Sequence, residues 1–135
     1  VGPTAVRKTA VALALAALLA LPVLALLLLA AHLAHAGLMP LAALAILLVG
    51  LLAVRRPWAS RTLQVVLAVA VIEWILTTAG LAQLRLRHDE PYLRLAAILG
   101  SVSLVTALAA LAFQHPVLDA YFRLPAKPAA EPATR

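Results

Sequence analysis

The sequence contains no cysteine, few acidic residues and few aromatic residues. Zero Cys excludes disulfides, thiolate-bound zinc and iron–sulfur clusters. Charged residues make up only 12% of the 135 residues and hydrophobic residues 65%. Together with a mean hydropathy of +1.05, this composition lies far outside that of soluble domains. We therefore expect an integral membrane protein of the all-α class.

Acidic residues are outnumbered by basic ones, 5 to 11, which gives a formal net charge of +6. In a soluble chain this surplus would suggest a nucleic-acid partner. Here the Lys and Arg residues flank apolar runs, and no basic patch has aromatic residues between its charges. The expected partners are therefore other membrane subunits and lipids, with no nucleic acid.

Sequence signatures of enzymes are also missing. The chain has no G-x-S-x-G, no H-E-x-x-H, no Walker loop and no G-x-G-x-x-G, which are motifs of hydrolases, zinc proteases and nucleotide-binding proteins. Intrinsic enzymatic activity is not expected, and no catalytic residue is assigned. The chain could still be a non-catalytic subunit of an enzyme complex.

Four apolar segments predict four transmembrane helices, since each crosses most of a hydrocarbon layer about 30 Å thick. Gly37 and Pro40 mark the turn after the first segment, and Pro116 follows the fourth. The stretch from Thr9 to Ala31 is longer than the core of a signal peptide, which favours a membrane helix over a cleaved leader. The predicted helices cover about 9–31, 40–54, 62–84 and 95–113, and a short interfacial segment completes a membrane domain of residues 9–122.

The basic residues predict the orientation. Counted on alternate sides of the four helices, eight Lys and Arg residues share the side of both termini, and three lie on the other side. By the positive-inside rule both termini are then cytoplasmic, and we expect a bacterial inner membrane. Residues 1–8 form the N-terminal segment, and the Pro- and Ala-rich tail 123–135 is expected to be disordered.

Glu73 is the only acidic residue in the apolar run 62–84 and lies near its centre. An acidic side chain there costs roughly 2.5–3.5 kcal/mol on insertion scales, so it marks a functional site by default. No Lys, Arg or His is expected at its depth. Three possibilities stay open: the carboxyl group is protonated, it lines a wet cavity and exchanges protons or ions, or it meets a polar group or cofactor of another subunit.

The neighbours of Glu73 extend this candidate site. Trp74 also has an N–H group to satisfy, and a second protein surface would cover it. At helical spacing, Thr77 and Gly80 share the face of Glu73. The fourth predicted helix carries a matching stripe of small residues, which lets helices approach closely in lipid. The predicted polar site is Glu73, Trp74, Thr77 and Ser103, and the predicted packing interface between helices three and four is Gly80, Ala96, Gly100 and Ala107.

The histidines are weak candidates for metal ligands. His32 and His35 end the first predicted helix, and His88 lies on the same side of the membrane if the topology holds. Their spacing does not require a metal, so no metal site is assigned. Haem, metal or pigment is expected only if it is shared with a partner, and lipid contacts are expected throughout.

Two functions lead, and a third, a metal- or quinone-handling protein, would be favoured by bound metal that is lost on replacing His32, His35 or His88. The first is a small accessory subunit of a larger membrane complex, of the respiratory, photosynthetic or transport kind, that packs through helices three and four. The second is a small homodimeric proton-coupled transporter that uses Glu73. In size and number of crossings the chain is similar to the small multidrug-resistance exporters. In that family, however, the membrane acid lies in the first helix, and here the first helix has none.

Overall fold

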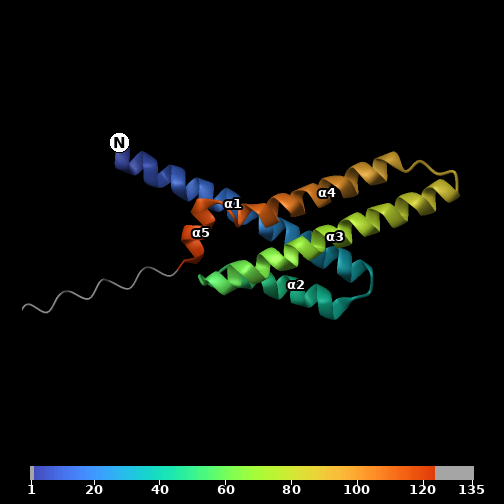
Figure 1. Ribbon diagram of the computed structural model, residues 1–135, viewed down its shortest axis with the longest axis horizontal. Coiled ribbons are helices and arrows are strands. Elements are labelled where there is room, and N and C mark those ends of the chain that lie inside the picture. The colour runs from blue at the N-terminus through green and yellow to red at the C-terminus, as the bar shows by residue number, and fades with distance from the viewer. Residues whose placement is uncertain (1, 124–135) are drawn as a thin grey trace, which may run out of the picture.

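The structure is a computed structural model that describes residues 2–123, so the tail predicted to be disordered lies almost wholly outside the described part. It is all-helical, as the composition predicts (Figure 1). Pro residues in the first turn begin four of the helices, where a missing N–H costs little. The helices are α1 (Pro3–His35), α2 (Met39–Leu51), α3 (Pro57–Arg87), α4 (Leu93–Ala112) and α5 (Pro116–Phe122).

Three of these helices, α1, α3 and α4, are long and apolar enough to cross a membrane. Inside such a layer the backbone must satisfy its own hydrogen bonds, which a helix does. Side-chain hydroxyl groups are also satisfied within their own helix, because Thr62, Thr78 and Ser101 each donate a hydrogen bond to the carbonyl four residues earlier. The helix α2 has 13 residues, or about 20 Å at 1.5 Å per residue, which is short of a hydrocarbon layer of about 30 Å.

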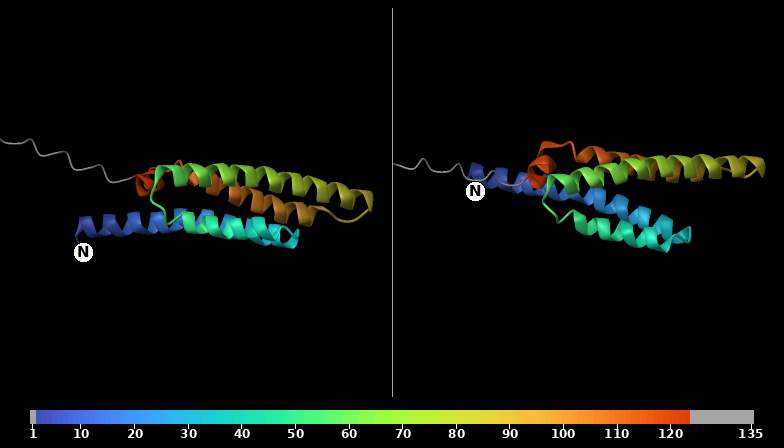
Figure 2. Two further views of the ribbon diagram at one scale, coloured as in Figure 1. Left: turned by 90° about the horizontal axis from the view of Figure 1, so that it is seen from below. Right: turned by 60° about the horizontal axis from the view of Figure 1, so that its bottom comes forward.

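The long helices and α2 form two hairpins, α1–α2 and α3–α4, which cross and diverge (Figures 1 and 2). Each hairpin turn contains one residue in the left-handed region: Gly37 with φ 78° and Asp89 with φ 53°. Glycine adopts this conformation freely, and Asp is one of the few other residues that tolerate it. The α3–α4 hairpin reaches well past the turn of α1–α2 (Figure 1).

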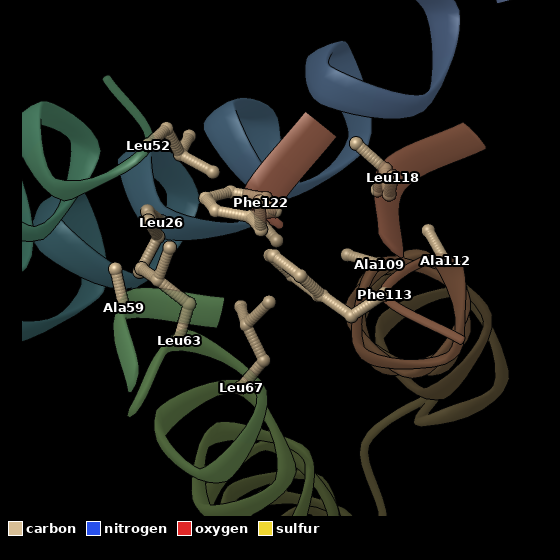
Figure 3. Packing of buried hydrophobic residues seen from close by; sticks show 11 residues of the cluster. Leu26, Leu52, Ala59, Leu63, Leu67, Ala109, Ala112, Phe113, Leu118 and Phe122 are labelled. Carbon is tan, nitrogen blue, oxygen red and sulfur yellow. The ribbon is translucent and has the colours of Figure 1, made fainter. Parts of the chain in front are cut away.

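The core is concentrated at the opposite end of the bundle, where α5 lies across the other helices (Figure 3). Phe122 and Leu118 of α5 are almost completely buried, as are Leu26 of α1 and Leu63 of α3. Tyr121 ties α5 to the end of α2, because its hydroxyl donates to the Leu52 carbonyl at 3.2 Å and the Arg55 guanidinium lies 4.6 Å from its ring centre. The middle of α1, the α2–α3 connection and α5 therefore meet in one core, and the N-terminal turns of α1 extend beyond it (Figure 1).

The helices α3 and α4 pack against each other, but the predicted glycine contacts are absent. Gly80 and Gly100 are exposed, and a Cβ added to either would meet nothing within 4 Å. Ala96 and Ala107 are only half-buried. The buried residues of α4 are Thr106, Ala109 and Ala112, so α4 is rotated about its axis relative to the prediction. Small size alone did not identify the packing face, because an Ala- and Leu-rich helix has small residues on every side.

Candidate functional site

Glu73 lies in the middle of α3 and has two polar neighbours. Its Oε1 accepts a hydrogen bond from the Thr77 hydroxyl at 3.3 Å, one helical turn along. The Nε2 atom of His32, on α1, lies 3.6 Å from the same oxygen. The Glu73 side chain is 48% exposed and that of His32 23%. The candidate site is therefore a pair of ionisable groups from two helices, partly covered by the chain itself.

This contact corrects the prediction that no basic group lies at the depth of Glu73. The prediction placed the end of the first helix at the far membrane boundary. Instead the last turns of α1 lie beside the middle of α3, because the α1–α2 hairpin is the shorter of the two (Figure 1). His32 thus supplies the partner that the sequence alone did not reveal.

Residues of the same chain bury Trp74, so a second protein surface is not needed to cover it. It is 4% exposed, and its ring lies against that of His32, with centroids 4.5 Å apart and planes at 45°. Its Nε1 atom is buried and has no hydrogen-bond partner among the described residues. The indole ring fixes one face of the imidazole, which leaves the His32 edge to meet Glu73.

Ser103, the fourth member of the predicted polar site, is engaged elsewhere. Its hydroxyl donates to the Leu99 carbonyl of its own helix at 3.0 Å, and the Thr106 hydroxyl donates to Val102 at 2.8 Å. Since a hydroxyl in an apolar helix readily bonds the carbonyl one turn back, α4 needs no carboxylate partner. Within the described residues, Glu73 bonds to Thr77 and contacts His32 instead.

A groove begins beside the pair and runs along α3 toward its C-terminal end. Its volume is about 620 Å³. One wall is the end of α1 with the residue after it, and the other is the second half of α3. The lining residues are His32, His35, Ala36, Thr77, Gly80, Leu81, Gln83, Leu84 and Arg87. Polar groups from both walls therefore face one space in an otherwise apolar region.

The histidines do not gather into a metal centre in residues 2–123, where no three His, Asp or Glu side chains lie close enough together to hold an ion. His32 and His35 line the groove, whereas His88 follows α3 and is exposed. Chemically, the site brings an imidazole and a carboxyl group to 3.6 Å, a contact that is an ion pair when His32 is protonated.

Comparison of the chain with protein-family models, with curated proteins and with solved structures finds no match. The geometry of the site therefore carries the functional argument.

Proposed function

We propose that this protein is a small accessory subunit of a larger membrane complex and that the Glu73 face of α3 contacts a neighbouring subunit. The observation that carries the proposal is the Glu73 carboxyl group, which is 48% exposed near the centre of an apolar helix. His32 and Thr77 contact one of its oxygens, Oε1. A carboxyl group that faced acyl chains without a partner would be costly, so a helix offering a hydrogen-bond donor is the expected neighbour.

The proposal includes the placement of the chain. Four helices enter a bacterial inner membrane, and both termini lie on its cytoplasmic side. Support comes from the end of the bundle at which α5 lies, where Arg55 contacts Tyr121 and Arg123 pairs with Asp119. Arg56 and Arg61 belong to the same α2–α3 region. A cluster of basic residues at one end is what the positive-inside rule associates with the cytoplasm.

The test is extraction of the native protein in a mild detergent, followed by measurement of its mass and stoichiometry. We expect a complex of fixed composition that contains larger proteins. Glu73→Leu should release the chain from it, because the carboxyl group is lost, whereas Glu73→Gln keeps a hydrogen-bonding group and should stay bound. Leu76→Ala is the matched control, since Leu76 is also exposed on α3 but apolar. Recovery of the native chain only as a monomer or homodimer would overturn the proposal.

A second candidate is a homodimeric proton-coupled transporter, and the His32–Glu73 contact favours it. An imidazole and a carboxylate 3.6 Å apart can bind and release a proton during a transport cycle. The purified chain, reconstituted in liposomes, would then show substrate-driven proton movement that Glu73→Gln abolishes. An accessory subunit shows no such flux with either residue.

A further inference from the structure

Polar side chains from two distant parts of the sequence converge on the groove. Between Thr9 and Val54 the only ionisable side chains are His32 and His35, and both line it. From the facing helix come the Thr77 hydroxyl, the Gln83 amide and the Arg87 guanidinium. In helices that are otherwise apolar, such convergence is expected where side chains face water rather than lipid.

The turn at the end of α1 gives an independent indication of water. The His32–Glu73 contact gives a common level on α1 and α3. From this level, Gly37 lies five residues, or about 8 Å, farther along α1 and its turn, and Arg85 lies twelve residues, or about 18 Å, farther along α3. The turn therefore ends about 10 Å short of Arg85, and Ala36 and Leu38 in it are exposed. Non-helical backbone at such a depth is tolerated where protein buries it or where it lines a water-filled cavity. Within residues 2–123 no protein covers Ala36 or Leu38 of this turn, which supports the presence of water there.

On its other side the pair meets packed apolar residues. Toward the α5 end, the helices are filled by Leu26, Leu63, Leu67 and Ala109, each 0% exposed (Figure 3). Among the described residues, this packed apolar core separates His32 from the end at which Arg55 and α5 lie.

We propose that the groove is a water-filled vestibule, open toward the loop of residues 88–92, that makes the His32–Glu73 pair a proton-binding site served from that side alone. A proton passes between vestibule water and either Nε2 of His32 or Oε1 of Glu73, with no change in oxidation state. The vestibule lies between the end of α1 and the second half of α3, and Glu73 is not among the residues that line it, so a subunit that contacts Glu73 can leave the vestibule open.

The charged groups that face the pair come from two helices. His32 and His35 belong to α1, and Arg87 stands on α3 at the mouth of the groove. The helix α2 contains no charged residue, and the one charged residue of α4 is Arg94, in its first turn. The carboxylate thus contacts one ionisable group, His32, while His35 and Arg87 line the groove farther from it.

The test uses single-cysteine variants, which the absence of native Cys makes direct. In the vestibule we place Gly80→Cys, where a Cβ meets nothing within 4 Å, and Thr77→Cys, one turn deeper. The matched controls Ala79→Cys and Ile75→Cys lie at similar depth, are exposed and point about 100–160° away around the helix from their partners. Glu90→Cys in the loop and Arg56→Cys at the other end identify which side a reagent reaches.

A charged, membrane-impermeant thiol reagent is applied to intact cells and to inside-out vesicles. We expect Gly80→Cys and Thr77→Cys to react roughly 100-fold faster than their controls, because a charged reagent is excluded from hydrocarbon. This reaction should occur only in the preparation that also labels Glu90→Cys. Equal rates in the vestibule and control positions, or labelling together with Arg56→Cys, would overturn the proposal.

A second measurement follows the proton itself in the full chain. The infrared band of the protonated Glu73 carboxyl group is obtained by subtracting the spectrum of Glu73→Gln from that of the native protein. The subtraction also removes the bands of the other acidic residues. In sealed vesicles this band should change with the pH of the side that labels Glu90→Cys and not with the pH of the other side. A band that follows both sides, or neither, would contradict a vestibule open on one side.

Discussion

At the end of the bundle where α5 lies, side chains from several helices close the core, whereas at the other end the α1–α2 hairpin stops short and leaves a groove. The closed end buries Phe122 and Leu118 and ties α5 to α2 through Tyr121. At the open end, two histidines of α1 line the groove opposite Thr77, Gln83 and Arg87 of α3. The same helices thus provide a packed apolar core and, about 20 Å away along the helices, a groove lined by polar side chains.

The difference follows from helix length. The helix α2 has 13 residues and α4 has 20, so the two hairpins cannot end at the same level once they are packed together at the α5 end. The shorter hairpin places His32 beside Glu73 and exposes the second half of α3. Shortening one helix therefore both creates the ionisable pair and leaves a path to it.

The largest effect is expected from the closed end. Phe122→Ala should lower the free energy of unfolding by about 3 kcal/mol, because it removes a buried ring that packs against Phe113 at 5.8 Å between centroids. The measurement is equilibrium unfolding in mixed micelles. Leu84→Ala in the groove is the control and should cost less than about 0.5 kcal/mol, since Leu84 is 52% exposed. Equal losses at both positions would remove the contrast between the two ends.

The two hairpin turns give the next largest effect. Gly37→Ala should cost about 1–2 kcal/mol, because at φ 78° a Cβ clashes with the following carbonyl oxygen. Asp89→Asn in the other turn should change stability little, since Asn also tolerates φ near 53°. Both are measured by the same unfolding titration. If Gly37→Ala were neutral, the α1–α2 turn would not be fixed at its present level beside α3.

Much of the fold could be predicted from the composition and from the positions of the prolines and charged residues. The absence of charge between Thr9 and Val54, the prolines at helix starts and the basic loops predicted an all-helical membrane protein, and the structure has five helices among the described residues, three of them long and apolar enough to cross a membrane. The sequence also singles out Glu73 as a candidate site, from its cost in hydrocarbon. These inferences depend on local properties of the chain, which a single sequence contains in full.

The partner of Glu73 could not be predicted while both hairpins were assumed to cross the whole layer. The signal that could have revealed it was the short second helix. If both hairpins start from one level, thirteen residues of α2 place the turn about 20 Å above it, and the sixteen residues from Pro57 to Glu73 rise about 24 Å. The turn that follows α1 is then near the level of Glu73 instead of at the far membrane boundary, which brings the end of α1 toward the middle of α3. The rotation of α4 could not be obtained this way, because its small residues do not favour one face.

A smaller loss is expected at the link between α5 and α2. Tyr121→Phe removes the hydroxyl that donates to the Leu52 carbonyl at 3.2 Å but keeps the ring beside Arg55. The expected cost is about 1 kcal/mol, the usual net value of one hydrogen bond. Arg55→Gln is measured beside it to separate the hydrogen bond from the contact of the guanidinium with the ring. No loss from Tyr121→Phe would mean that the apolar side chains alone hold α5 in place.

The smallest effect is expected on the face of α3 and α4 where a glycine contact was predicted from the sequence. Gly80→Ala and Gly100→Ala should each leave stability unchanged or raise it by up to about 1 kcal/mol, since the added methyl group meets nothing within 4 Å and Ala favours the helix. At a true close approach of helices the same change would force the backbones apart and lower stability. The control is Ala109→Leu, which adds bulk at a residue that is 0% exposed and should be clearly destabilising. If Gly100→Ala lowered stability as much as Ala109→Leu does, Gly100 would lie in the helix interface, as the sequence predicted. The α4 helix would then be rotated relative to the structure, and different residues would flank Glu73.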